Sequence, residues 1–202
     1  MGLLDGKVAF ITGAARGQGR SHAVRLAEEG ASIIAVDICE DIESNPYPMS
    51  SWEDLEETRR LVEKSGSSCV AIKADVRERR QLADALAQGV STFGRLTTVC
   101  ANAGILPMAM GDPQPTDFQD AVDVDLIGVM NAVRVAIPHV INAGREGSVL
   151  GFSPVLIAEH APLAGPVVAQ HMGTQKPCRT VVEGRDRPML NRRSRHKTVI
   201  VL

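Results

Sequence analysis

The sequence predicts an α/β protein in which a doubly wound parallel sheet lies between two layers of helices. Short apolar runs alternate with helical patterns over residues 1–150, and a glycine-rich turn follows the first of these runs. The second run ends at an aspartate, Asp37. Alternation of this kind is typical of parallel strands joined by right-handed crossovers, with helices on both faces of the sheet.

Each predicted strand is a short, unbroken apolar run, as expected for a strand that is covered on both faces. The helices are predicted where apolar residues recur at helical spacing and a stop signal such as Gly30 follows. The polar segment 38–51 contains two prolines and is predicted to be a loop. The predicted strands are 8–12, 32–36, 69–72, 96–100 and 147–152, and the helices after the first are 52–64, 78–93 and 118–142.

Composition excludes several classes of protein. The net charge of −2 provides no general attraction to nucleic acid or to an anionic membrane. No apolar run reaches 18 residues, and the first ten residues do not resemble a signal peptide. The four cysteines lack a CxxC pair, which argues against a disulfide framework or a metal site and favours a reducing compartment. We therefore expect a cytoplasmic protein that has no metal site, nucleic-acid partner or membrane partner.

The glycine-rich turn has the form expected of a phosphate cradle. Gly13, Gly17 and Gly19 lie between a buried strand and the start of a helix. Glycine lets the backbone turn sharply and approach a diphosphate closely, and the helix start offers free N–H groups. The spacing is GxxxGxG rather than GxGxxG, so an ordinary tight turn is the alternative.

Asp37 lies 18 residues after Gly19, at the end of the second predicted strand. A carboxylate near this distance binds the adenosine ribose of a dinucleotide, which predicts a Rossmann-type site. A carboxylate there also repels a 2′-phosphate, so NAD is favoured over NADP. Arg16 favours the opposite preference as a phosphate partner, and Asp37 as an ordinary loop acid is the further alternative.

Two more polar segments follow predicted strands at the carboxyl edge of the sheet, where open α/β sheets bind ligands. They are Asp75-Val76 and Asn102-Ala103-Gly104, and the alternative for each is a turn. The predicted cofactor-binding residues are Gly13, Arg16, Gly17, Gln18, Gly19, Asp37, Ile38, Asp75, Val76, Asn102, Ala103 and Gly104.

These motifs resemble those of the classical short-chain dehydrogenases/reductases. The matching segments are TGAARGQG (12–19), AVD ending at Asp37, ADV (74–76) and ANAG (101–104). With the inserted loop, the first 153 residues resemble the mycofactocin-coupled, carveol-dehydrogenase-like branch. The resemblance implies reversible oxidation of secondary alcohols with an NAD that stays bound.

The resemblance also implies a role for each matching residue. The three glycines would hold the diphosphate, Asp37 the adenosine ribose, and Asp75 with Val76 the adenine. Asn102 and Gly104 would support the sheet and line the nicotinamide side.

The catalytic residues of the family do not match this chain. The family uses a tyrosine, a lysine four residues later, an upstream serine and an asparagine on the long helix. The only tyrosine here is Tyr47, in the 38–51 loop. The aligned positions hold Val167 for the tyrosine, His171 for the lysine, Pro154 for the serine and Asp125 for the asparagine.

Ser153, beside Pro154, and His171 are the remaining catalytic candidates. Histidine titrates near neutral pH and can act as an acid or base, so His171 or His160 could replace the family's residues. The alternative is that both histidines lie on the surface.

Residues 154–202 lose the α/β pattern. Prolines interrupt helices in the first part, and 183–197 is polar and basic, as in a disordered tail. We therefore divide the chain into an NAD-binding core (1–153) and a degenerate or truncated remnant of the catalytic half (154–202). A shifted reading frame would explain the change, and translation of the other frames tests this hypothesis.

Three interpretations of function follow from the sequence. The first is an NAD-dependent oxidoreductase acting on a secondary alcohol or ketone. The second is a catalytically silent NAD-binding protein, and the third is a non-functional truncated product. The expected partners are a small-molecule substrate and either further copies of the chain or an intact paralogue.

Overall fold

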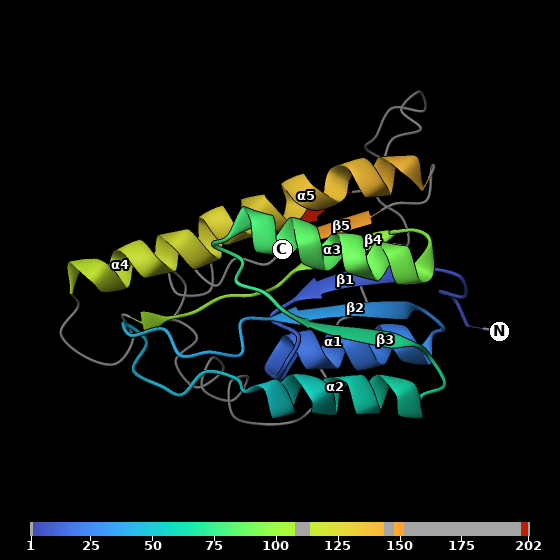
Figure 1. Cartoon of the computed structure of the whole chain (residues 1–202), viewed down its shortest axis with the longest axis horizontal. Coiled ribbons are helices and arrows are strands. Elements are labelled where there is room, and N and C mark those ends of the chain that lie inside the picture. Colours follow the sequence, from blue (N-terminus) through green and yellow to red (C-terminus); the bar gives the residue numbers. More distant parts are fainter. Residues whose placement is uncertain (1, 108–113, 144–147, 152–198, 202) are drawn as a thin grey trace, which may run out of the picture.

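One parallel sheet organises the computed structural model, which describes residues 2–107, 114–143, 148–151 and 199–201. Its strand order is β3-β2-β1-β4-β5-β6, and every neighbouring pair is parallel (Figure 1). This arrangement confirms the predicted fold class. The strands are β1 (Val8–Thr12), β2 (Ser32–Asp37), β3 (Cys69–Lys73), β4 (Thr98–Ala101), β5 (Ser148–Gly151) and β6 (Val199–Val201).

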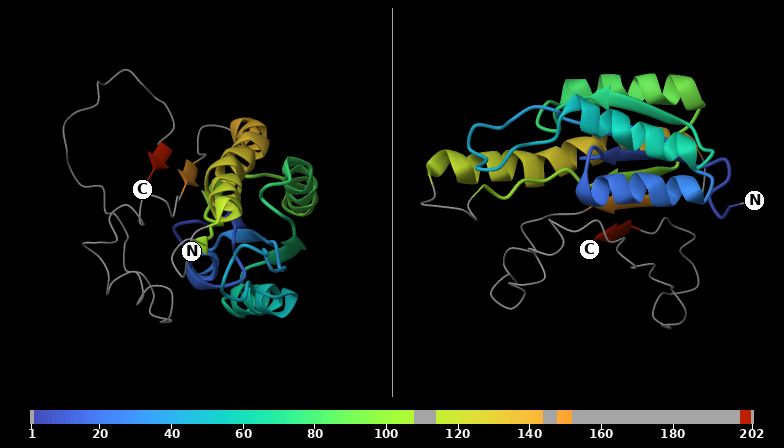
Figure 2. Two further views of the ribbon diagram at one scale, coloured as in Figure 1. Left: turned by 90° about the vertical axis from the view of Figure 1, so that its left-hand side faces the viewer. Right: turned by 90° about the horizontal axis from the view of Figure 1, so that it is seen from below.

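Helices cover both faces of the sheet, as Figures 1 and 2 show from three directions. Alternate residues of β1 belong to different apolar clusters: Phe10 packs on the side of α3 and α5, and Ile11 on the side of α1 and α2. Both side chains are completely buried. The helical segments are α1 (Gly17–Glu28), α2 (Trp52–Lys64), α3 (Arg79–Phe93), α4 (Pro115–Val122), the π-helical segment η2 (Asp123–Gly128) and α5 (Val129–Asn142).

Two predicted boundaries are wrong by two residues or more, and one strand was not predicted. The fourth strand was placed at 96–100, but β4 begins at Thr98. The hydroxyl of Thr97 instead accepts a hydrogen bond from the Val8 N–H at 2.9 Å, which replaces a strand-to-strand bond at this point. The long helix begins at Pro115 rather than at residue 118, and the short strand β6 lies within the segment assigned to the remnant.

The long helical run Pro115–Asn142 is apolar enough, by length and composition alone, to cross a membrane. Core helices of other proteins pass the same test, and here α5 packs against β4 and α3. We therefore assign this helix to the layer that covers the sheet. Large apolar side chains remain exposed along it, namely Phe118, Leu126, Ile127, Met130, Ile137 and Ile141.

Candidate cofactor site

The glycine turn between β1 and α1 lies at the carboxyl edge of the sheet. Gly13 and Gly17 adopt φ angles of +66° and +55°, which favour glycine. A Cβ on Gly13 would lie 2.7 Å from the Ala103 Cα, and one on Gly19 only 2.0 Å from the Gly13 carbonyl oxygen. A Cβ on Gly17 would meet no atom of the described residues within 4 Å. Gly13 and Gly19 are thus required by packing, whereas Gly17 leaves the backbone open to a ligand.

Asn102 braces this turn from the end of β4. Its side-chain amide donates to the Thr12 carbonyl at 3.0 Å and to the Gly13 carbonyl at 3.3 Å. The backbone N–H groups of Asn102 and Ala103 both donate to the Thr12 hydroxyl, at 3.0 and 3.1 Å. The predicted residues at the ends of β1 and β4 are therefore brought together. Gly104 follows them and is exposed.

Two residues that sequence analysis did not identify hold the turn from the opposite side. The Thr58 hydroxyl, on α2, donates to the Ala14 carbonyl at 2.9 Å. The guanidinium of Arg20 donates to the Ala15 carbonyl and, at 2.9 Å, to the Thr58 hydroxyl. These bonds fix the carbonyl groups of Ala14 and Ala15 in the turn.

The first turn of α1 remains available to an anion. It contains no acidic residue, and Arg16 is its N-cap without a side-chain capping bond. Arg16 and Gly17 are exposed and Gln18 is half-buried. Free N–H groups and the helix dipole make such a helix start favourable for a phosphate group.

Asp37 joins the turn to the end of β2. Its side chain is only 6% exposed, and its Oδ2 atom accepts a hydrogen bond from the Ala15 N–H at 2.9 Å. Its Oδ1 atom accepts from the Ser50 hydroxyl at 2.6 Å and from the Cys39 N–H at 3.3 Å. A carboxylate offers about four acceptor sites, so one remains for a ligand hydroxyl.

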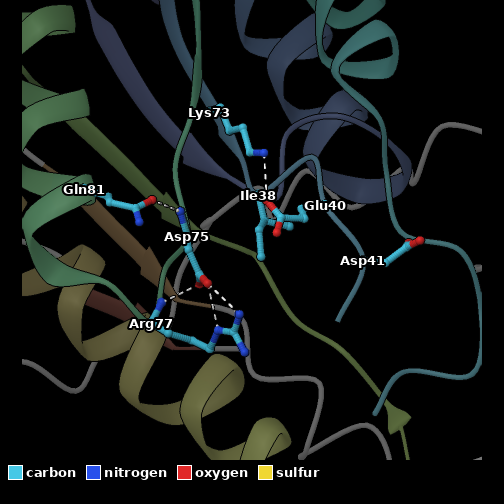
Figure 3. A pocket seen from close by; sticks show the side chains of 7 residues that line it. All are labelled: Ile38, Glu40, Asp41, Lys73, Asp75, Arg77 and Gln81. Atoms are coloured by element: carbon cyan, nitrogen blue, oxygen red, sulfur yellow. Dashed lines mark hydrogen bonds and ion pairs between the residues drawn. The ribbon is translucent and has the colours of Figure 1, made fainter. Parts of the chain in front are cut away.

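A polar pocket lies at the ends of β2 and β3, and Ile38, the residue after Asp37, is one of its lining residues (Figure 3). Within it, Asp75 is held by Arg77, whose Nε atom donates to Asp75 Oδ2 at 2.8 Å. The Lys73 ammonium pairs with Glu40 at 2.8 Å. Val76 is buried, and its carbonyl accepts from the Asn131 amide at 3.1 Å. The lining residues are Ile38, Glu40, Asp41, Lys73, Asp75, Arg77 and Gln81.

The 38–51 loop connects the β2 side of the site to the α4 side. The Tyr47 hydroxyl accepts a hydrogen bond from the Leu106 N–H at 3.1 Å, and the Arg16 guanidinium lies 6.0 Å from the centre of the Tyr47 ring. The Ser44 hydroxyl donates to Asp120 Oδ2, on α4, at 2.6 Å. The single tyrosine of the chain thus anchors this loop.

Asp125 lies in the π-helical segment η2 and is 2% exposed. Its Oδ1 atom accepts from the Ile105 N–H at 2.9 Å, whereas its Oδ2 atom has no hydrogen-bond partner among the residues that the structure describes. Burial raises the pKa of the Asp125 carboxyl to about 6, although the Ile105 bond opposes this rise. The carboxylate form of Asp125 is therefore less favourable than that of an exposed aspartate.

The catalytic candidates Ser153 and His171 lie outside the described residues, as do Pro154, His160 and Val167. Within the part of the chain that the structure describes, no group of three or more His, Cys, Asp or Glu side chains is arranged to hold a metal ion.

A parallel sheet with a glycine turn at a helix start and a buried carboxylate on the neighbouring strand defines a dinucleotide-binding protein of the Rossmann type. The model of the short chain dehydrogenase family matches residues 7–162. The chain belongs to this family, as its motifs predicted.

Curated relatives include an uncharacterized oxidoreductase of Mycobacterium tuberculosis, 54% identical over 80% of this chain and 57% of the relative. The (-)-trans-carveol dehydrogenase of Rhodococcus erythropolis is 40% identical over 87% of this chain and 62% of the relative. The chain therefore spans about three fifths of the length of these relatives.

A solved structure of carveol dehydrogenase from Mycobacterium avium in complex with NAD has a TM-score of 0.72 and 41% identity, over 85% of this chain and 69% of that one. A short chain dehydrogenase from Mycobacterium paratuberculosis bound to NAD also has a TM-score of 0.72, with 39% identity over 84% of this chain and 70% of that one. These neighbours confirm the predicted likeness to the carveol dehydrogenase branch.

Proposed function

We propose that the protein is an NAD-dependent oxidoreductase that transfers hydride between a secondary alcohol or ketone and nicotinamide. The observation that carries this proposal is the contrast between the glycines of the turn. Gly13 and Gly19 are packed against protein atoms, whereas Gly17 faces open space at the start of α1. A diphosphate fits this position because its charge meets the N–H groups of the helix start.

Asp37 would select the adenosine ribose. Its remaining acceptor site suits a ribose hydroxyl, which can donate a hydrogen bond. The carboxylate would repel the 2′-phosphate of NADP. The Ala15 N–H donates to the same carboxylate at 2.9 Å. The residue that would bind the ribose is therefore hydrogen-bonded to the turn that would bind the diphosphate.

The remaining cofactor residues divide between the two ends of the dinucleotide. Ile38, Asp75 and Val76 would surround the adenine, beside the pocket shown in Figure 3. Asn102, with Ala103 and Gly104, would lie on the nicotinamide side. When bound, NAD supplies the nicotinamide ring that accepts or donates hydride.

The 38–51 loop would keep NAD bound between turnovers. It is attached beyond the site at Leu106 and Asp120, so NAD would leave only after these bonds break. We further propose that residues 1–153 bind the cofactor and that 154–202 derive from the catalytic half.

Binding is tested by thermal unfolding of the full chain with and without NAD. A ligand at 100 times its Kd stabilises the folded state by about 2.7 kcal/mol, which raises the melting temperature by about 5–10 °C. NADP at the same concentration should produce a smaller shift. A melting temperature that responds to neither dinucleotide would refute the proposed site.

The reaction is tested by adding carveol to the NAD-loaded protein and following NADH fluorescence. Carveol is the probe because a relative 40% identical to this chain is a carveol dehydrogenase. Formation of NADH supports the redox proposal. A melting shift without NADH formation would retain dinucleotide binding and refute turnover by this chain.

We also propose self-association and a cytoplasmic location. Exposed apolar side chains such as Leu126, Met130 and Ile137 follow one helical run and could be covered by a second copy. The described cysteines Cys39, Cys69 and Cys100 are free thiols, as expected in a reducing compartment. Light scattering of the purified chain tests association, and a monomeric mass would refute it.

A further inference from the structure

We infer that Ser50 is a positioning residue that orients the Asp37 carboxylate for the ribose and makes the 38–51 loop part of the selection of NAD over NADP. The inference rests on the proposed role of Asp37. Ser50 is 6% exposed, and its hydroxyl donates to Asp37 Oδ1 at 2.6 Å. No motif marks this serine, and it lies 13 residues after its partner.

The hydrogen bonds of Asp37 show what Ser50 contributes. Rotation about the last side-chain bond of aspartate is broadly permitted, so the plane of the carboxylate is set by its partners. Ala15 N–H fixes Oδ2 at 2.9 Å, but a single bond leaves the plane free to rotate about that contact. On Oδ1 the Cys39 N–H is distant at 3.3 Å, whereas the Ser50 hydroxyl is close. Ser50 is therefore the second point that fixes the plane.

The start of α2 holds Ser50 in place. The next residue, Ser51, caps this helix: its hydroxyl accepts from the Asp54 N–H at 3.2 Å, and its own N–H donates to the Asp54 carboxylate at 2.9 Å. The loop therefore ends at a fixed position, directly after the residue that contacts Asp37.

Orientation of the carboxylate affects the two dinucleotides differently. The ribose of NAD donates hydroxyl hydrogens and needs an acceptor at a defined angle. The adenosine ribose of NADP keeps only its 3′-hydroxyl as a donor, and its 2′-phosphate meets the negative charge of Asp37. Loss of Ser50 should therefore weaken the binding of NAD more than the binding of NADP.

The test measures Kd for NAD and for NADP by calorimetry on the full chain, with Ser50→Ala as the variant. We expect Kd for NAD to rise about three- to tenfold, a factor that corresponds to one ordinary hydrogen bond, and Kd for NADP to rise less, so that the preference for NAD falls. Ser51→Ala is the matched control. It removes the helix cap and lowers the melting temperature, but it should keep the NAD/NADP ratio.

Two further variants make the result decisive. Asp37→Asn must lower the preference for NAD; if it does not, the proposed role of Asp37 is wrong and the inference falls with it. If Asp37→Asn lowers the preference and Ser50→Ala does not, only the inference is wrong. Ser50→Cys, close in size but a weak donor, replaces Ser50→Ala should that variant unfold. If both Ser50 variants unfold, or Ser51→Ala lowers the ratio equally, the role of Ser50 is merely structural.

Discussion

Replacement of the buried Asp125 by asparagine should change how stability depends on pH. Asp125 is 2% exposed and accepts one hydrogen bond from Ile105, and within the described part of the chain its Oδ2 atom has no partner. A single hydrogen bond does not offset the free energy that a carboxylate loses when burial removes its hydrating water. Asparagine keeps an oxygen for the Ile105 N–H and carries no charge, and by resemblance it is the family's residue at this position.

The magnitude follows from the pKa of Asp125, which rises from 3.8 to about 6 on folding. The folded protein then binds the proton more tightly than the unfolded chain, so stability falls as pH rises from about 4 to 6. Above pH 7 the loss reaches about 3 kcal/mol. Because the asparagine side chain does not titrate, the stability of Asp125→Asn relative to the parent should grow by about 2 kcal/mol between about pH 4.5 and pH 8.

Urea unfolding of both proteins at several pH values measures this difference. The change of the difference with pH is the quantity of interest, because an unpartnered asparagine amide adds a cost that does not depend on pH. Asp123→Asn is the matched control, since the Asp123 carboxylate accepts from Gln119 at the surface of the same helix. Stability curves of Asp125→Asn and the parent that stay parallel across the whole pH range would refute the reasoning.

Three further predictions concern the turn and the loop. Gly17→Ala should weaken NAD at least about tenfold while costing about 1 kcal/mol of stability, because its Cβ enters the open ligand side; Gly19→Ala, with a Cβ 2.0 Å from a carbonyl oxygen, should cost about 3 kcal/mol. Urea unfolding and calorimetry separate the two, and equal stability losses would contradict this distinction. Thr58→Val should cost about 1–2 kcal/mol in urea unfolding, since the Ala14 carbonyl loses its donor; an unchanged midpoint would exclude this role. Ser44→Ala should speed NAD release in stopped-flow measurements because the bond to Asp120 is lost, and an unaltered rate would show that this contact does not retain the cofactor.

The fold could be predicted because its signals are local. The run Val8–Thr12 is apolar at successive positions, and both faces of β1 are buried. The errors arose where a side-chain hydrogen bond or pairing with a distant strand determines where a strand forms. The Thr97 hydroxyl takes the place of a backbone partner ahead of β4, and Val199–Val201 becomes a strand only by pairing with β5.

The residues of the candidate site also fall into those that the sequence could predict and those that it could not. The glycines and Asp37 follow from spacing, since a turn and a strand end impose fixed distances along the chain. Arg20 and Thr58 do not, because the bond between them joins residues 38 positions apart. Arg20 and Thr58 have ordinary polar side chains and belong to no motif. Only the packing of α1 against α2 shows that they bind the carbonyl groups of the glycine turn.

The two buried aspartates show why burial alone does not identify a binding carboxylate. Asp37 and Asp125 are exposed to 6% and 2%, yet Asp37 receives three hydrogen bonds and Asp125 only one. Three donors fix the orientation of the Asp37 carboxylate, so its oxygen atoms can face a ligand hydroxyl. One donor does not offset burial, and Asp125 holds its proton up to a pKa of about 6. The hydrogen-bond donors around a buried carboxylate therefore decide whether it can bind a ribose or only lowers the stability of the fold. For Asp37 these donors come from the glycine turn and the 38–51 loop.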